Sequence, residues 1–221
     1  APVSSHQFFN YKHIIPGLWY PGTGTRSCAA SYKWYRDVFG EAEAQEAKTR
    51  HTSAYEILNQ AAEQVPPGSG DLYFHPYLLG EMTPYYDDRL RASFTGVGMH
   101  HGKGHFSRAV MEGISYSMRD CLEEIKKQNI SVNEYRIIGG GAKGKLWRQI
   151  LADVLNTELM STKDNDSSLG SAMLAGVAAG IFKSFKESVE KCVTVADIVT
   201  PIERNVEIYE RGFENYRLIR K

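Results

Sequence analysis

Gly139-Gly140-Gly141-Ala142, followed by Lys143 and Gly144, is the stretch of this 221-residue chain that decides its fold. It lies between a predicted strand at 135–138 and a predicted helix at 143–156, in which apolar residues recur at steps of three and four. Glycines let a backbone approach a phosphate closely, and the positive end of the following helix favours an anion. The junction therefore predicts a nucleotide site.

The same glycines also fit two other interpretations. Gly139, Gly141 and Gly144 form a literal G-x-G-x-x-G, and Asp164 stands near the position expected for the ribose-binding acid of a dinucleotide site. Against an NAD site, the pattern falls in the last third of the chain, and the third glycine is followed by the charged Lys145. The glycines could also make only a tight turn from strand to helix, so the motif by itself leaves these alternatives open.

Strands and helices alternate outward from this junction. Strands are predicted at 6–12, 17–20, 92–97, 135–138 and 158–161, with a short one from 72. Helices are predicted at 27–39, 41–48, 52–64, 104–127, 143–156, 169–182 and 202–218. Prolines and glycines at 66–70 predict a loop, so 65–71 is a candidate internal boundary. This order predicts an α/β architecture.

Composition argues against several classes of function. Lys plus Arg and Asp plus Glu both number 26, so no basic excess predicts a nucleic-acid partner. No segment reaches the roughly 20 apolar residues of a membrane span, and the first residues lack the pattern of a secretory signal. Three widely spaced cysteines without CxxC spacing predict reduced thiols in a cytoplasmic protein.

A histidine cluster and several carboxylates are candidate reactive groups. His100, His101 and His105 lie close together, but no Cys, Asp or Glu completes a ligand set nearby, which favours a solvated loop over a metal site. Nothing in the spacing of the carboxylates nearest the glycine-rich segments pairs them for acid–base chemistry. We therefore expect surface or loop charges at Glu81, Asp87, Asp88 and Glu112.

Three segments, in this order, resemble the C-terminal region of the FGGY carbohydrate kinases. They are PYLLGEMTP at 76–84, the segment 94–113 that begins FTGV and ends RAVMEG, and the segment 139–153 that begins GGGA and ends LWRQILAD. The last segment is most similar to the xylulose kinases within the family. A helix near the start of the family's C-terminal domain is also similar, at Ser31, Trp34, Arg36 and Asp37, so the resemblance covers nearly all of 1–221.

The resemblance implies a fold and a set of site residues. The fold is a ribonuclease-H-like lobe of the actin and hexokinase type, with a mixed sheet flanked by helices and with ATP and Mg²⁺ in a cleft. Gly140, Gly141 and Ala142 match the family turn that packs against the adenosine and the α-phosphate. Three further matches lie near the base, although their residue types differ from those of the family: Lys145, Ala29 and Lys33.

The activity that the resemblance implies is ATP-dependent phosphorylation of a pentulose such as D-xylulose. The family's catalytic Asp belongs to a segment that would precede residue 1, and an N-terminal lobe, absent from this sequence, makes most contacts to the sugar. We therefore assign no catalytic residue and expect this chain alone to bind ATP or ADP without catalysis. A non-catalytic nucleotide- or partner-binding module remains an alternative, and the sugar and a homodimeric state stay open.

Overall fold

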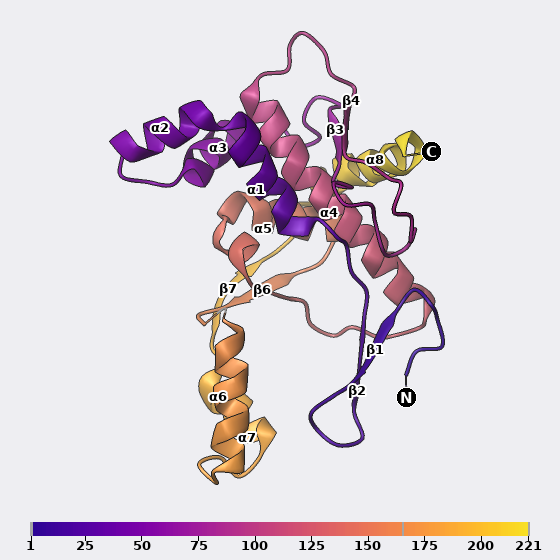
Figure 1. Ribbon diagram of the computed structural model, residues 1–221, viewed down its shortest axis with the longest axis vertical. Helices are drawn as coiled ribbons and strands as arrows, with labels where there is room; N and C mark the ends of the chain where they lie inside the picture. Colours follow the sequence, from indigo (N-terminus) through magenta and orange to yellow (C-terminus); the bar gives the residue numbers. More distant parts are fainter. Residues whose placement is uncertain (1, 165, 221) are drawn as a thin grey trace.

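The computed structural model describes residues 2–164 and 166–220. A long helix, α4 (Lys103–Lys127), runs through the body of the molecule (Figure 1). The elements that pack against it are α1 (Cys28–Phe39), α3 (Ala54–Glu63), β3 (Tyr73–His75), α5 (Lys145–Leu155) and α8 (Glu203–Ile219). Because these elements cover it from several directions, α4 is buried along the whole run from Ser107 to Ser117.

The N-terminal helices follow the predicted ranges closely. The helices predicted at 27–39, 41–48 and 52–64 are α1, α2 (Glu41–Thr49) and α3. Ser53 begins α3 as an N-cap, because its hydroxyl accepts from the backbone N–H of Glu56 at 3.2 Å. That cap fixes where the first turn of α3 begins.

The strands form three small sheets. β1 (Phe9–Lys12) and β2 (Trp19–Gly22) form an antiparallel ribbon, and β3 pairs antiparallel with β4 (Ser93–Thr95). β6 (Leu159–Thr162) lies between a parallel neighbour, β5 (Arg136–Ile137), and an antiparallel one, β7 (Val195–Val199). The predicted mixed sheet is confirmed in this third sheet, against which α5 packs.

The C-terminal part departs from the prediction in two ways. The helix predicted at 169–182 is shorter and earlier, α6 (Ser167–Ala178), because the Asp166 side chain caps it and the chain turns at Gly180 with φ of 74°. Asn165, in the predicted loop before it, lies outside the described residues. α7 (Phe185–Cys192) and β7 were not predicted, and α6 and α7 extend together away from α4 (Figure 1).

The loop at 65–71 is a bend within one packed body. Leu58 and Ala62 before the loop and Leu72 and Phe74 after it belong to a single cluster of buried residues. The loop itself is bonded to α4 by backbone and side-chain hydrogen bonds. Among the described residues, no helix has the length and apolar character needed to cross a membrane.

Candidate functional site

A pocket of about 340 Å³ lies between the glycine turn and two helices of the first quarter of the chain. α1 contributes Ala29 and Tyr32 to its lining, and α3 with its cap contributes residues between Ser53 and Asn59. The glycine turn and the start of α5 contribute the rest, from Gly140 to Trp147. Segments that are far apart in the sequence therefore meet at one concave surface, as is typical of small-molecule sites.

The turn has a shape that only glycine adopts readily. Gly139 has φ of 86°, in the left-handed region. One turn of 3-10 helix, η1 (Gly140–Lys143), follows, and α5 begins at Lys145, so the predicted helix start at 143 is two residues early. The first N–H groups of α5 have no acceptor within the helix, which gives this side of the pocket a positive character.

Tyr32 connects the two helices that form the other side of the pocket. Its hydroxyl donates to Asn59 Oδ1 at 2.8 Å. Burial raises the pKa of Tyr32, so this hydroxyl keeps its proton and acts as a donor at neutral pH. The Tyr32 ring lies 5.4 Å from the Tyr55 ring and 5.8 Å, edge to face, from the Trp147 ring. These rings give the pocket a largely aromatic wall, which suits a flat ligand ring.

Four of the six predicted site residues lie at or under the pocket surface. Ala29, Gly140 and Gly141 are part of its lining. Ala142 is only 3% exposed and lies beneath the turn, where its backbone N–H donates to the carbonyl oxygen of Gly139 at 3.1 Å. The exposed backbone of the two glycines, rather than Ala142, is therefore what a ligand would meet.

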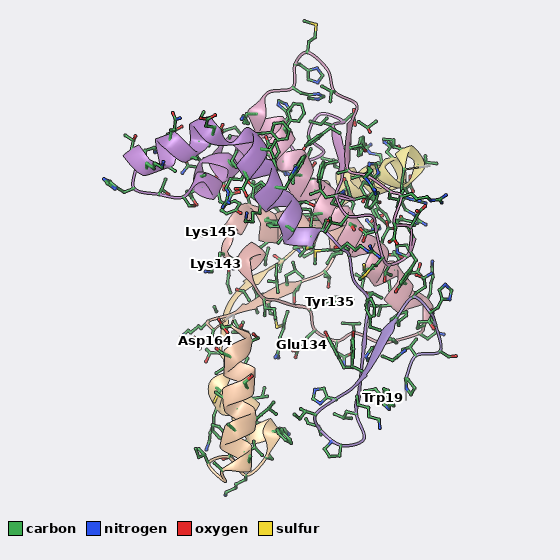
Figure 2. All side chains as sticks on the ribbon, viewed as in Figure 1. Trp19, Glu134, Tyr135, Lys143, Lys145 and Asp164 are labelled. Atoms are coloured by element: carbon green, nitrogen blue, oxygen red, sulfur yellow. The ribbon has the colours of Figure 1, made fainter. Side chains whose placement is uncertain are left out.

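The two predicted lysines are not on the pocket lining. Lys33 is exposed, and its ammonium pairs with Asp37 one turn further along α1 at 2.5 Å. Lys145, the first residue of α5, is exposed outside the lining. Lys143, two residues earlier, does line the pocket (Figure 2 labels both lysines). The lysine placed to meet an anionic ligand is therefore Lys143.

Sequence reasoning missed the aromatic and amide side chains of the pocket. Tyr32 could have been found, because it lies one helical turn after Ala29 and so shares its face. Trp147 belongs to the segment that resembles the kinases, but no contact to the turn was predicted for it. Tyr55 and Asn59 carry no such signal, because their place depends on how α3 packs against α1.

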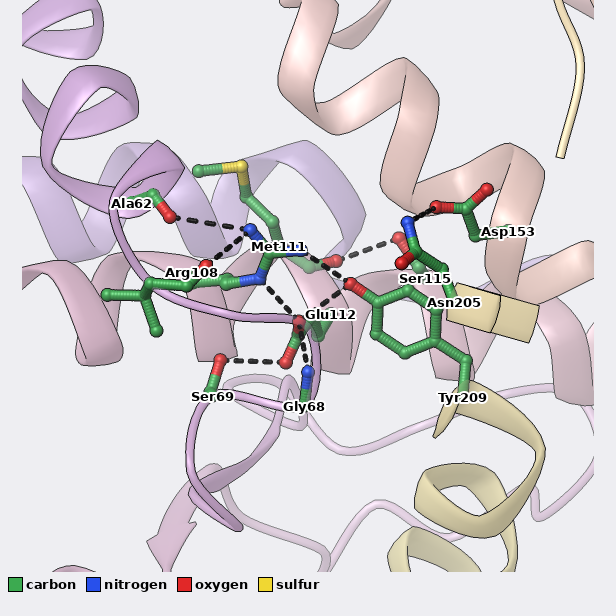
Figure 3. Close-up of polar contacts among 11 residues, drawn as sticks. Ala62, Gly68, Ser69, Arg108, Met111, Glu112, Ser115, Asp153, Asn205 and Tyr209 are labelled. Atoms are coloured by element: carbon green, nitrogen blue, oxygen red, sulfur yellow. Dashed lines mark hydrogen bonds and ion pairs between the residues drawn. The ribbon is translucent and has the colours of Figure 1, made fainter. Parts of the chain in front are cut away.

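Glu112 contradicts the prediction of a surface or loop charge. It is 2% exposed, and its Oε1 pairs with Arg108 Nε at 2.8 Å (Figure 3). The same carboxylate accepts from the backbone N–H of Gly68 at 3.0 Å, from Ser69 Oγ at 2.7 Å and from the Tyr209 hydroxyl at 2.8 Å. Such a set of bonds fixes helices and a loop in place, and none of these residues lines the pocket.

The prediction of a surface or loop charge is also wrong for Glu81. It is 1% exposed and accepts from Ser117 Oγ at 3.1 Å and from the backbone N–H of Arg26 at 2.9 Å. Burial raises the pKa of Glu81. The other two carboxylates are loop charges as predicted, since Asp87 pairs with Arg89 and Asp88 pairs with Arg26 in salt bridges.

The three histidines lie in and beside the loop before α4. The rings of His100 and His101 are 4.0 Å apart, and those of His101 and His105 are 5.2 Å apart. His101 Nδ1 accepts from the backbone N–H of Gly98 at 2.9 Å, and its Nε2 donates to the carbonyl oxygen of Gly70 at 3.0 Å. Both ring nitrogens of His101 therefore hold the loop.

The sequence is similar to curated sugar kinases along nearly its whole length. The family model described as "FGGY family of carbohydrate kinases, C-terminal domain" matches residues 2–179. A xylulose kinase of Staphylococcus epidermidis is 35% identical over 212 residues, which are 96% of this chain and 41% of that protein. A xylulose kinase of Lactococcus lactis is 34% identical over 217 residues, 97% of this chain and 41% of that protein. The chain thus spans about 41% of the length of these relatives.

The fold is also that of a solved kinase structure. The crystal structure of xylulose kinase from Rhodospirillum rubrum matches with a TM-score of 0.83 at 25% identity, over 98% of this chain and 42% of that one. The expected actin and hexokinase type of fold is therefore confirmed. The matches in sequence and in structure agree that this chain belongs to the FGGY family of carbohydrate kinases and corresponds to its C-terminal domain.

Proposed function

We propose that this chain is the nucleotide-binding part of an ATP-dependent pentulose kinase, and that the sugar is D-xylulose. The observation that carries the nucleotide site is the meeting of Ala29, Gly140 and Gly141 on one pocket, since these residues come from distant segments. The choice of sugar is supported by the names of the two relatives described above, which are xylulose kinases.

In this proposal the pocket holds the adenosine end of ATP or ADP. The base would lie against the aromatic wall of Tyr32, Tyr55 and Trp147, and the backbone of Gly140 and Gly141 would admit the first phosphate. Magnesium would accompany the phosphates, as in phosphoryl transfer generally. Residues 2–164 and 166–220 contain no group of three or more His, Cys, Asp or Glu side chains that could hold a metal ion, so no ligand of Mg²⁺ is assigned to them.

We propose further that this chain does not transfer phosphate by itself. Phosphoryl transfer depends on positioning the nucleotide, the sugar and a base together, and the pocket supplies one of these three. The experiment is an assay of ADP release from ATP in the presence of D-xylulose. We expect no release above the background without enzyme, and an ordinary kinase rate would contradict this part of the proposal.

The nucleotide site is tested by titrating the chain with ADP and measuring the binding by calorimetry. A Cβ on Gly141 would lie 3.3 Å from Cζ3 of Trp147, so Gly141→Val displaces the Trp147 ring and fills the pocket. We expect the dissociation constant for ADP to rise at least about tenfold, a loss of about 1.4 kcal/mol. The matched control is Gly170→Val in α6, where a Cβ would meet no atom within 4 Å. Equal ADP affinity in both variants would contradict the site.

The alternative is a non-catalytic nucleotide- or partner-binding module of the same fold, and its nucleotide-binding form predicts the same ADP binding. It differs in the activity expected when this chain is joined to an N-terminal lobe, since such a protein would bind ADP and phosphorylate no sugar. We also propose a cytoplasmic location, because Cys28, Cys121 and Cys192 are free thiols, which suits a reducing compartment. The partners that we propose are ATP or ADP and a sugar, and we propose no nucleic-acid partner.

A further inference from the structure

Asn59 presents a hydrogen-bond donor at the pocket. The Tyr32 hydroxyl donates to its Oδ1 at 2.8 Å, which fixes the direction of the side-chain amide. Its Nδ2 is close to Gly144, where a Cβ would lie 3.7 Å away. Within 2–164 and 166–220, Nδ2 donates to no protein acceptor. An oriented amide N–H on a pocket lining is a group that a ligand acceptor can pair with.

Glu56 presents an acceptor on the same helix face. It also lines the pocket, one turn before Asn59 in α3, and its backbone N–H is held by the Ser53 cap at 3.2 Å. Its carboxylate accepts from no group of the described residues. Side chains three residues apart on a helix are neighbours, with Cβ atoms about 5–6 Å apart. The α3 side of the pocket therefore offers an acceptor and a donor next to each other.

This order of groups matches one purine better than the other. Along one edge, adenine carries the N7 acceptor beside the N6 amino donor, whereas guanine carries two acceptors, N7 and O6. The Asn59 amide could donate to N7 of either base. When Asn59 donates to N7, the neighbouring group on that edge is an N–H donor only in adenine; guanine would instead place O6 against the Glu56 carboxylate, where two acceptors repel each other. Stacking on the aromatic wall does not discriminate, because every base has a π-face.

We propose that Glu56 and Asn59 determine the nucleotide specificity of this pocket by selecting adenine over guanine. Tyr32 acts as a positioning residue, because its hydroxyl holds the Asn59 amide with the N–H groups free. This inference rests on the proposed nucleotide site and deepens it by naming the groups that read the base. Both specificity residues lie in α3, outside the glycine turn.

The first test compares ADP with GDP by calorimetry on this chain. We expect ADP to bind about tenfold to a hundredfold more tightly than GDP. Glu56→Gln supplies an amide N–H that can donate to O6, so the preference for ADP should fall about tenfold while ADP still binds. The matched control is Glu63→Gln, an exposed residue of the same helix outside the pocket lining, which removes the same charge. It should leave the preference unchanged.

The second test addresses Asn59 and N7. Asn59→Leu should weaken ADP and GDP alike, by about tenfold, because both bases use N7. The 7-deaza analogue of ADP, which lacks the N7 acceptor, should bind the wild-type chain more weakly than ADP does. For Asn59→Leu, the 7-deaza analogue and ADP should have equal affinity, because the variant lacks the donor to N7. Tyr32→Phe, which keeps the ring, should reproduce part of the Asn59→Leu loss.

The outcomes separate this inference from the proposed function. Equal affinity for ADP and GDP in the wild-type chain would overturn the inference and leave the nucleotide site standing. An unchanged preference in Glu56→Gln would also overturn the role of Glu56, and since this side chain is exposed, loss of folding is not expected to obscure the result. If neither nucleotide binds the wild-type chain, the proposed function fails and the inference fails with it.

Discussion

Two polar regions of the molecule, the Glu112 network and the pocket beside Gly141, differ in whether their groups are satisfied by the protein itself. In the network, the Arg108 guanidinium, the Glu112 carboxylate and the Tyr209 hydroxyl bond to one another while almost fully buried (Figure 3). At the pocket, Asn59 Nδ2 and the Glu56 carboxylate have no partner among the described residues. Satisfied groups hold the fold together, and the unsatisfied ones are where a ligand can contribute.

The satisfied region also supports the pocket from a distance. Asp153 in α5 accepts from Asn205 Nδ2 and from the backbone N–H of Ile202, both at 2.8 Å, and so fixes α5 to the start of α8. Tyr209 in α8 in turn bonds to α4 through Glu112. Because the glycine turn leads into α5, these bonds hold one side of the pocket without touching a ligand.

The largest effect is expected from breaking the network. Glu112→Ala leaves the Arg108 guanidinium buried without its anionic partner, so the free energy of unfolding should fall by about 3–5 kcal/mol. Urea denaturation monitored by circular dichroism measures this free energy of unfolding. Tyr209→Phe, which removes one hydroxyl and keeps the ring, should cost only about 1 kcal/mol. Glu56→Ala, at the pocket, should stay within about 0.5 kcal/mol of the wild type, and an equal loss in Glu56→Ala and Glu112→Ala would contradict the comparison.

Two glycines provide the next largest contrast. A Cβ on Gly113 would lie 2.0 Å from the carbonyl oxygen of Phe74, so Gly113→Ala must push α4 and β3 apart. We expect a loss of about 1–3 kcal/mol in the free energy of unfolding. A Cβ on Gly140 would meet no atom within 4 Å, so Gly140→Ala should leave thermal stability nearly unchanged. Equal melting temperatures for the two variants would contradict the close approach of α4 to β3.

Local pattern was enough to predict most of the elements and one side of the pocket. The apolar periodicity around Val110 and Ile114 predicted α4, and the glycine run predicted the turn. β7 was missed although its sequence, VADIV, is rich in β-branched residues, because a short edge strand gives a weak signal next to helix α7.

The other side of the pocket and the network could not be predicted in the same way. Tyr55 and Asn59 reach the pocket only because α3 packs beside α1, which is tertiary information. Glu112 looked like a free carboxylate by its spacing, although Arg108 four residues earlier was a signal for an ion pair on one helix face. What decided its burial was the cover that loop 65–71 and α8 place over α4.

A change of pH should have a smaller effect on the free energy of unfolding, and this effect should come from groups in the buried region rather than from the pocket. His75 Nε2 donates to the carbonyl oxygen of Tyr216 at 2.9 Å, and burial, with a contribution from the nearby Arg220 charge, lowers the pKa of His75 below its ordinary value of 6.5. The unfolded chain therefore binds this proton more readily than the folded one. The stabilising contribution is complete above pH 6.5 and is lost as the pH falls through that value, by at most about 1.4 kcal/mol per pH unit.

The measurement is the difference in unfolding free energy between the wild type and His75→Gln at several pH values. His75→Gln should lose the part of the acid slope that begins near pH 6.5. Buried Glu81 and Asp120, whose pKa values are raised by burial, act in the opposite direction as the pH falls. Parallel pH profiles for His75→Gln and the wild type would show that the His75 proton is not coupled to folding.

The smallest effect separates two exposed lysines, Lys143 at the end of η1 and Lys145 at the start of α5, and it bears directly on what the pocket geometry adds to the sequence. Lys143 lines the pocket and Lys145 does not. Lys143→Ala should raise the dissociation constant for ADP about two- to fivefold at low salt, because an exposed charge contributes little and salt screens it. Lys145→Ala should leave it unchanged. If Lys145→Ala has the larger effect, the family match, which places Lys145 near the base, locates the nucleotide better than the pocket does, and the unsatisfied groups beside Gly141 lose their link to the ligand.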